Sequence, residues 1–451
     1  MKKKVLFLAL LLAVMAFAFI ACDRNGDDDQ PVATPPPLPQ PEASPAATPA
    51  PPQDNQQAET PPPVADDRVL TLGIWAGNDA EWASIERVRE DFERETGITI
   101  EWRLYTDLNA QVMADLAAGI APDAFYIDSG LAEQFVYLGV LAPLDRGVFD
   151  TASFYQNVLD TFTFNNTVYA IPKDQSILAR YVNTDLLAAV GMTIADIPSD
   201  AESYLEFLPR LQAALDDQFG SGQVFAASGV YEPARQLHVL NRNVSPFNAD
   251  GTSNMSHPDV VRHAEFIHSL FATGAMLTPQ MMGAGWNGEA FGLGLTVIME
   301  EGNWVYSFLH NYFPDTNFEI IDMPTYLGQR SSMLFTVGWG INVNSPNIDL
   351  ATTWIQYKTG PEGMYNWCVA AGPLPTRPDV AQRMAANLSP GLNVHLNQIP
   401  YATPWVMGRF QSFINDGYMN YMSAAIAGEM SIADAMDSAD TMANFLINIA
   451  R

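Results

Sequence analysis

The stretch RVLTLGIWAGNDAEWASIERVREDFERETGITIEWRLY, residues 68–105, contains the unit from which we predict the fold. It begins with an apolar, β-branched run that ends at Gly77, which is typical of a buried strand. A helix is predicted next, because apolar residues recur at helical spacing and Gly97 follows as a stop signal. The apolar positions of this helix are Trp82, Ile85, Val88 (or Arg89) and Phe92. Residues 98–105 then alternate in character, as a half-buried strand does.

The same alternation of strand and helix continues toward the C-terminus. We predict a helix over residues 107–119, a third strand at Pro122–Asp128, and a helix with a turn over residues 130–144. Repeated strand–helix units predict a parallel sheet with helices on both faces. The folded part runs from Arg68 to Arg451, roughly 380 residues, which is enough for two domains.

The N-terminus has the three parts of a secretory signal. Residues 2–4 are lysines, residues 5–20 are almost all apolar, and Ala21 is a small residue before Cys22. The apolar segment is shorter than the roughly 20 residues that a membrane span needs. Its end, FIAC, resembles a bacterial lipobox, in which the cysteine becomes the lipidated first residue. We predict that residues 1–21 are a cleaved signal peptide and that Cys22 carries lipid; an ordinary signal beside a structural cysteine is the alternative.

Residues 22–67 differ in composition from the parts on either side. They are rich in Pro, Ala, Gln and Thr and contain few large apolar residues, so they cannot bury a core. The prolines favour extended polyproline II segments. We predict a lipid-anchored, disordered linker that holds the folded part away from the membrane; a recognition role for the prolines is the alternative.

The charge and the cysteine content narrow the class of protein. The formal net charge of −29 at pH 7 disfavours nucleic acid and other polyanions, which require patches of Lys and Arg. We therefore expect a neutral or cationic ligand. The two cysteines are Cys22 and Cys368, so a lipid on Cys22 leaves Cys368 without a partner. We expect a fold without disulfides that is stabilised by core burial.

Two pairs of ionisable residues are weak candidates for catalysis. Glu300 and Glu301 are adjacent, so on a strand they point to opposite faces and cannot flank one glycosidic bond. We predict that they form acidic surface at a strand end. His263 and His268 lie five positions apart, which does not match the i, i+4 spacing of a zinc protease helix, and we predict a polar helix face there.

Motifs for other chemistry are missing from the sequence. It contains neither a G-x-S-x-G motif nor a P-loop, and FGLGLT (residues 291–296) lacks the third glycine of a dinucleotide-binding loop. A phosphate-binding loop therefore has no support, and we predict that the protein uses no metal or other cofactor.

Segments along nearly the whole folded part resemble, in collinear order, the extracytoplasmic family 1 solute-binding proteins. These are the carbohydrate-type receptors of ATP-binding-cassette (ABC) importers. The segments are the strand–helix units of residues 68–145, VYAIPKDQSILARYVNTDLLAAVGM (168–192), AFGLGLTVIMEEGNWV (290–305), FTVGWGINVNSPNIDLATTWIQYKTGPEGM (335–364), AGPLPTRPDV (371–380) and MSAAIAGEMSIADAMDSADTMANFL (422–446).

The resemblance implies an α/β fold of the two-lobe, periplasmic-binding-protein-like kind (type II). Each lobe would be a mostly parallel sheet flanked by helices, with crossover strands between the lobes and the ligand in the cleft. Lobe 1 would comprise residues 68–174 plus 340–380, and lobe 2 residues 175–339 plus 381–451. The implied partners are a small-molecule substrate and the transmembrane subunits of an ABC permease. The protein itself would be a monomer located outside the cytoplasm.

Residues that could bind a sugar are found near the ends of predicted strands, in turns and at the crossovers. Sugars present flat C–H faces and a rim of hydroxyl groups, so receptors stack aromatic rings on the faces and use polar side chains on the rim. The predicted ligand contacts are Trp75, Asp79, Tyr126, Asp128, Asp174, Trp286, Asn287, Trp304, Trp339, Trp405 and Arg409. We also expect Asn303 to cap a short helix that directs Trp304 into the cleft.

Three of these spacings are similar to those of maltose-binding members of the superfamily. They are Trp75 to Asp79, Gly302 to Trp304, and Trp405 to Arg409. The third strand departs from that pattern, because Tyr126 and Ile127 stand where those proteins have a Trp before the Asp. The stacking in lobe 1 is therefore expected to differ.

We predict a lipid-anchored substrate-binding component of an ABC importer that captures a sugar or oligosaccharide and performs no covalent chemistry. Three alternatives stay open from the sequence. The same scaffold could bind an organic cation such as a polyamine, since Asp-rich walls with aromatic faces suit cations. The others are a surface glycan hydrolase and a sensor that presents its ligand to a membrane kinase.

Overall fold

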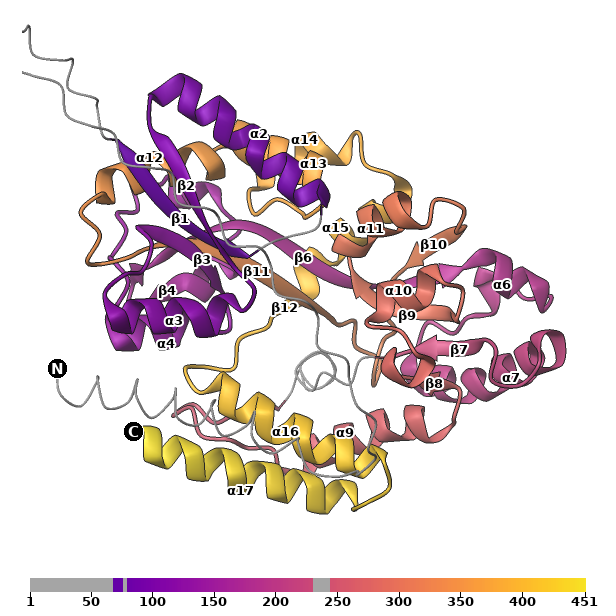
Figure 1. The fold of residues 1–451 in the computed structure, drawn as a ribbon. Helices are drawn as coiled ribbons and strands as arrows, with labels where there is room; N and C mark the ends of the chain where they lie inside the picture. The colour runs from indigo at the N-terminus through magenta and orange to yellow at the C-terminus, as the bar shows by residue number, and fades with distance from the viewer. Residues whose placement is uncertain (1–67, 76–78, 230–243) are drawn as a thin grey trace, which may run out of the picture. The chain divides into compact units, whose positions relative to one another are not determined.

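The computed structural model describes residues 68–75, 79–229 and 244–451 (Figure 1). The predicted signal peptide and linker, with Cys22, lie outside the described residues. Val69–Arg451 group by their contacts into one unit.

The predicted strand–helix repetition is confirmed in the N-terminal part of this unit. Strand β1 (Val69–Trp75) lies between β2 (Thr99–Tyr105) and β3 (Ala124–Asp128), and it is parallel to both. The helices that alternate with these strands are α2 (Asp79–Thr96), α3 (Leu108–Ala118) and α4 (Ala132–Leu138). Helix α2 buries Ile85, Val88 and Phe92 of the predicted apolar stripe, whereas Trp82 is half-buried.

Two long antiparallel strands join this group of strands to a second parallel group (Figure 1). Strand β6 (Ala170–Asn183) is buried at every residue and pairs with β11 (Ser332–Ile341), which also pairs with β3. The second group is β9 (Thr296–Gly302), β7 (Phe225–Ser228) and β8 (Met276–Leu277), in which β7 is parallel to both neighbours. Because β9 pairs with β6, all these strands belong to one ten-stranded sheet.

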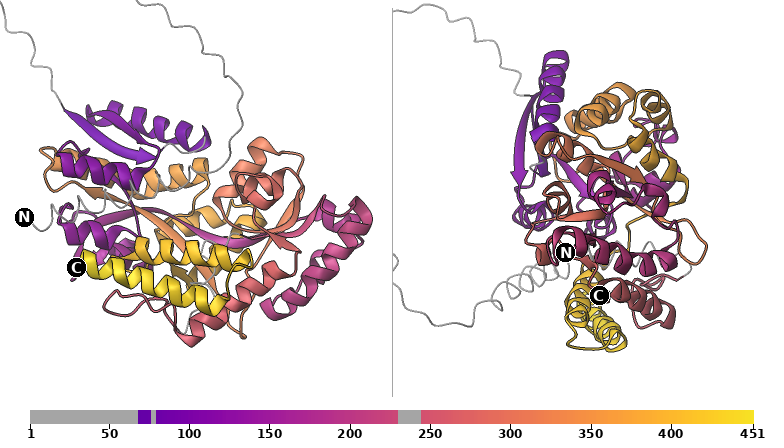
Figure 2. Two further views of the ribbon diagram at one scale, coloured as in Figure 1. Left: turned by 60° about the horizontal axis from the view of Figure 1, so that its bottom comes forward. Right: turned by 90° about the vertical axis from the view of Figure 1, so that its right-hand side faces the viewer.

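Short strands and further helices complete the described elements. Strand β10 (Phe318–Ile321) pairs with β6 and β12 (Ala402–Pro404) with β11, and β4 (Thr163–Phe164) pairs with β5 (Thr167–Val168). The remaining α-helices are α5 (Gln156–Leu159), α6 (Thr184–Ala189), α7 (Ala201–Phe219), α9 (Pro258–Ala272), α10 (Asn287–Gly292), α11 (Trp304–Tyr312), α12 (Ile348–Thr359), α13 (Pro361–Ala371), α14 (Pro378–Ala385), α15 (Pro390–Gln398), α16 (Gln411–Ile426) and α17 (Ile432–Ala450). Helices α16 and α17 lie side by side (Figure 2) and contact α9.

Strand β6 changes its partner along its length. It pairs with β11 over residues 170–177 and with β9 over residues 178–182. Both β6 and β11 therefore run through the region in which the crossovers were expected. The lobe boundaries stay a prediction, because the contacts do not divide Val69–Arg451 further.

Asn303 stands directly before α11 as expected, but it does not cap the helix with its side chain. Its Oδ1 accepts a hydrogen bond from the backbone N–H of Ile177 (3.1 Å), and its Nδ2 donates to the carbonyl oxygen of Gly372 (2.9 Å). The side chain therefore connects β6 to the loop after α13, and the prediction of a side-chain cap is wrong.

The predictions for the acidic pair and for His263 are also wrong about exposure. Glu301 is 3% exposed and lies 3.4 Å from the Nδ2 of Asn287, while Glu300 is half-buried opposite Arg180 on β6. Burial raises the pKa of Glu300, and the charge of Arg180 opposes that shift. His263 is buried on α9 against the ring of Tyr326, because it shares the apolar face of that helix. Its pKa is lowered to about 4 by burial.

His395 on α15 forms hydrogen bonds with two residues in the middle of β6. Its Nδ1 lies 2.6 Å from the carbonyl oxygen of Ile177, and its Nε2 lies 2.9 Å from the hydroxyl of Tyr181. A carbonyl oxygen can only accept, so Nδ1 carries the proton and Nε2 of the neutral ring accepts from Tyr181. Burial lowers the pKa of His395 to about 4, which keeps the ring neutral near neutral pH.

The free energy of unfolding should therefore fall as the pH drops from 6.5 toward 4. The unfolded chain binds a proton near pH 6.5, whereas the folded chain resists it until about pH 4. Between pH 6.5 and 5 this one group should cost about 2 kcal/mol, and urea unfolding at the two pH values measures it. His395→Gln should reduce the slope, while the buried His263, whose pKa is also lowered to about 4, supplies a second part that stays in this variant. His268→Gln, at a half-buried position on α9, is the control and should keep the wild-type slope. A wild-type slope in His395→Gln would refute the assignment.

Candidate functional site

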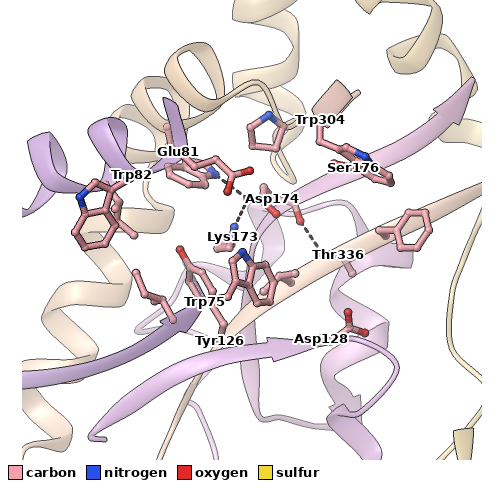
Figure 3. Close-up of a pocket in the computed structure, with 16 residues that line it drawn as sticks. Trp75, Glu81, Trp82, Tyr126, Asp128, Lys173, Asp174, Ser176, Trp304 and Thr336 are labelled. Carbon is pink, nitrogen blue, oxygen red and sulfur yellow. Dashed lines mark hydrogen bonds and ion pairs between the residues drawn. The ribbon is translucent and has the colours of Figure 1, made fainter. Parts of the chain in front are cut away.

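A cavity of about 280 Å³ opens where the first group of strands meets β6, β11 and α11 (Figure 3). Its walls come from strands β1, β3, β6 and β11 and from helices α2, α11 and α13. The lining residues are Ile74, Trp75, Glu81, Trp82, Ile85, Tyr126, Asp128, Lys173, Asp174, Ser176, Trp304, Phe335, Thr336, Val337, Trp367 and Pro373. Five of the predicted ligand contacts are therefore brought together: Trp75, Tyr126, Asp128, Asp174 and Trp304.

Aromatic rings form two walls of the cavity. On one side, Trp75 at the end of β1 contacts Tyr126 on β3, with ring centroids 5.0 Å apart. On the other side, Trp304 at the start of α11 contacts Phe335 on β11 at 5.3 Å. Both pairs meet edge to face, the arrangement that the quadrupoles of aromatic rings favour. Phe335 is supported from behind by Trp405 at 5.2 Å.

Gly302 is required for the position of Trp304. A Cβ atom at residue 302 would lie 2.1 Å from the Trp304 ring, far inside van der Waals contact. The ring therefore lies directly over the backbone at the end of β9. The ring lines the cavity, and the predicted contact of Trp304 with a ligand stays a prediction.

Lys173 and Asp174 are neighbours in the chain, yet both line the cavity. On a regular strand, adjacent side chains point to opposite faces. Here Asp174 is opposite Val337 and Pro172 is opposite Gly338, so Lys173 is an extra residue in the ladder. A β-bulge of this kind redirects side chains. The Nζ of Lys173 forms an ion pair with Oδ2 of Asp174, and Nε1 of Trp367 donates to the same oxygen (2.7 Å).

A second lysine lies behind Trp367. The Nζ of Lys358, on α12, is 3.8 Å from the centroid of the Trp367 ring, and the side chain is 1% exposed. It has no hydrogen-bond partner among the described residues. Burial, and next the nearby charge of Lys173, hold the pKa of Lys358 well below its ordinary value.

Two residues of β3 that line the cavity, Tyr126 and Asp128, carry polar groups. The hydroxyl of Tyr126 is buried and has no hydrogen-bond partner in the described part of the chain. Burial and the charge of Asp174 raise its pKa, so it stays a protonated donor. Asp128 uses Oδ1 to accept from the N–H of Gly130 (2.8 Å), and burial raises the pKa of its carboxyl. Asp128 is therefore the polar side chain that β3 presents at the cavity, while the Tyr126 ring forms part of the wall.

Trp339 is a core residue in the structure and does not line the cavity. It is fully buried beneath Tyr126, whose ring centroid lies 4.4 Å away, and it also contacts Trp354. Its two flanking glycines are strand residues of β11. A Cβ at Gly340 would lie 2.2 Å from Ile127, and one at Gly338 would lie 3.0 Å from Ala170. These glycines permit close packing; they do not mark an open crossover loop.

Trp286 and Asn287 lie outside the cavity lining. The Trp286 ring packs on Phe308, with centroids 4.6 Å apart, as part of the core around β9. Asn287 is buried, where its Oδ1 accepts from the hydroxyl of Ser228 and its Nδ2 faces Glu301. The segment in which these two ligand contacts were predicted is therefore the start of α10, anchored by a buried polar network.

The three other predicted contacts have different surroundings. Trp405 stands behind Phe335 and does not line the cavity. The guanidinium of Arg409 lies over the ring of Tyr137 on α4 (4.3 Å) and over Phe410 (4.4 Å). Asp79 begins α2, but its side chain lies outside what the structure describes.

Several lining residues were missed from the sequence. Glu81 and Trp82 follow β1 in the first turn of α2, so their position after a strand end was a usable signal. Trp367 lies inside α13, where the sequence gives no sign of a cavity. Lys173 was not predicted to line the cavity, because a β-bulge cannot be recognised from the alternation of apolar and polar residues along a strand.

Three further features of the described residues concern membrane spans, metal ligands and cysteine. None of their helices is long and apolar enough to cross a membrane. They contain no cluster of three or more His, Cys, Asp or Glu side chains that could hold a metal ion. Cys368 is buried in α13, and burial raises the pKa of its thiol.

Solved structures of solute-binding proteins share this fold. A solute-binding protein of an ABC transporter from Thermotoga lettingae, bound to α-D-tagatose, has a TM-score of 0.74 and 17% identity over 84% of this chain and 100% of its own. Lmo0181 from Listeria monocytogenes, in complex with cycloalternan, has a TM-score of 0.74 and 16% identity, covering 85% and 100%. Maltose-bound MalE3 from T. maritima has a TM-score of 0.71 and 20% identity, covering 84% and 100%. The predicted two-lobe, periplasmic-binding-protein-like α/β fold is thereby confirmed.

The sequence itself identifies the family. Residues 87–391, more than half of the chain, match the family model described as bacterial extracellular solute-binding protein. The chain belongs to this family, whose members bind solutes outside the cell. The resemblance seen in the sequence is confirmed.

Proposed function

We propose that this protein binds a neutral sugar or one end of an oligosaccharide in the cavity, without covalent change, and delivers it to an ABC permease. The observation that carries the proposal is the combination of aromatic walls with polar groups. Trp75 on one side and Trp304 on the other, both half-buried, can stack on sugar faces. Asp128 can bind hydroxyl groups, as can Oδ1 of Asp174, whose Oδ2 is engaged by Lys173 and Trp367. The sugars bound in the similar structures support the same class of ligand.

The size of the cavity favours a small ligand or a ligand end. Small-molecule sites commonly measure about 300–1,000 Å³, and this cavity lies at the lower end. We propose that one sugar ring occupies the described cavity. The sugar would then contact the first group of strands through β1 and β3, and the second group through α11, which follows β9. Contacts from both groups favour a closed form.

The two lobes and the N-terminal lipid anchor are part of the same proposal. Lobe 1 (68–174 plus 340–380) and lobe 2 (175–339 plus 381–451) would close on the ligand, and the stacking of Arg409 on Tyr137 would connect them. A lipid on Cys22 would anchor the monomeric protein outside the cell, with residues 22–67 as the linker. The ordinary signal peptide beside an unmodified cysteine is the alternative.

Titration with a glycan panel tests the function. Intrinsic tryptophan fluorescence and the melting temperature should change with at least one neutral mono- or oligosaccharide at millimolar concentration or below, and the mass of the glycan should be unchanged afterwards. No response to any glycan would contradict sugar binding. A change in glycan mass would instead indicate the hydrolase.

Gly302→Ala should weaken glycan binding by about tenfold or more, because the new methyl group displaces the Trp304 ring from the cavity wall. Isothermal titration calorimetry measures the loss. Gly288→Ala is the matched control, since its Cβ would meet the Trp286 ring at 2.3 Å, away from the cavity. That variant should keep the wild-type affinity.

A double-mutant comparison tests the mechanism of this effect. In a Trp304→Ala background the ring is gone, so Gly302→Ala should cause no further loss of affinity. An equal loss in both backgrounds would show that Gly302 acts through the strand and not through Trp304.

A further inference from the structure

Lys173 places a cation of the protein itself among the aromatic rings of the cavity (Figure 3). Its Nζ lies 4.6 Å from the ring centroid of Tyr126, 4.7 Å from that of Trp367 and 5.9 Å from that of Trp75. An ammonium within about 6 Å of a ring centroid is attracted to the ring. We call these three rings the aromatic cage, and Lys173, 4% exposed, occupies it.

The position of the ammonium is fixed from two directions. Asp174 pairs with it, and the same carboxylate oxygen is held by Nε1 of Trp367, which is a ring of the cage. The bulge in β6 delivers Lys173 and Asp174 to the same side of the strand. The lysine is therefore part of a built arrangement and is not a mobile surface chain.

An organic cation would need the features that Lys173 already uses. Such ligands bind by resting an ammonium on aromatic faces beside a carboxylate. Here the cage and the Asp174 carboxylate are both engaged, and a second positive charge would be repelled at short range. An ammonium has three N–H donors, of which Asp174 takes one, so Lys173 can also donate to ligand oxygens.

We infer that Lys173 is a specificity-determining residue, which excludes organic cations from the cavity and donates hydrogen bonds to the oxygens of the sugar. The second part of this inference, hydrogen bonding to the sugar, rests on the proposed function. It decides between a sugar and a polyamine, the two ligand classes that the sequence left open.

Chemical rescue of Lys173→Ala in the full-length protein tests the cage. The substitution removes a three-carbon ammonium, and n-propylammonium reproduces the missing atoms. The variant should bind n-propylammonium at least about tenfold more tightly than wild type does, and it should bind 1-propanol, the neutral control, no better than wild type. Calorimetry and the shift in melting temperature measure both. Equal responses of the variant to the two probes would contradict the claim that the aromatic cage binds an ammonium group.

Lys173→Gln provides a second test that keeps most of the side-chain volume. Putrescine should bind this variant at least about tenfold more tightly than wild type, because the repelling charge is gone while Asp174 and Asp128 stay. The same variant should bind the glycan found in the panel more weakly. Unchanged affinity for putrescine would overturn the exclusion of cations.

The two proposals can fail separately. If wild type binds putrescine as tightly as Lys173→Gln does, the inference about Lys173 is wrong whatever the glycan panel shows. If no glycan binds wild type but the cation results are as expected, sugar binding and hydrogen-bond donation to it are wrong, whereas the exclusion of cations stands.

Discussion

Trp339→Ala should lower the free energy of unfolding by about 4 kcal/mol, the cost of truncating a large buried aromatic side chain. Trp339 is fully buried between Tyr126 and Trp354, whose ring centroids lie 4.4 Å and 5.8 Å away. Removing the indole leaves a cavity in the centre of the sheet, under the wall that carries Tyr126. Urea unfolding followed by circular dichroism measures the loss.

Trp304→Ala is the matched control for this prediction. Trp304 is half-buried at the cavity, so its removal should cost much less stability and much more glycan affinity than the removal of Trp339. The opposite pattern, in which Trp339→Ala keeps its stability but loses the glycan, would restore Trp339 as a direct ligand contact. The pair of variants thus separates a core tryptophan from a binding tryptophan.

The different positions of these two tryptophans show what sequence reasoning can and cannot reach. Trp304 was predicted in the cleft, because a glycine and a turn precede it after an apolar strand, and in the structure it lines the cavity. Trp339 also stands next to glycines, but its glycines allow packing against Ile127 and Ala170, which are distant in sequence. The same local pattern therefore has two causes, and only the tertiary partner distinguishes them.

The overall fold was easier to predict than the site. The strand–helix order, the parallel N-terminal strands and the two long crossover strands follow from periodicity and from the family resemblance. The site depends on single residues that depart from a regular pattern. Lys173 enters the cavity only because β6 has a bulge, and Trp367 enters it from the interior of a helix.

Asp174→Ala should also destabilise the protein strongly, by about 3–5 kcal/mol. The carboxylate is buried, pairs with the ammonium of Lys173 and accepts from Nε1 of Trp367. Removing it leaves Lys173 without its carboxylate partner and the indole N–H without its acceptor, while Lys358 lies on the same tryptophan ring. The loss of one partner of a buried pair costs more than the pair contributes, because the other charge stays buried.

A double-mutant cycle tests whether the ion pair causes this loss. Asp174→Ala combined with Lys173→Met removes both charges, so it should recover about 2 kcal/mol or more relative to Asp174→Ala alone, measured by urea unfolding. Asp91→Ala, which breaks an exposed pair with Arg94 on α2, is the control and should change the stability little. If the double variant is no more stable than Asp174→Ala, the hydrogen bond from Trp367, and not the charge of Lys173, dominates the contribution of Asp174. In that case the ammonium of Lys173 would be stable in the aromatic cage without its carboxylate partner. The positive charge of Lys173, without the contribution of Asp174, would then account for the exclusion of cations.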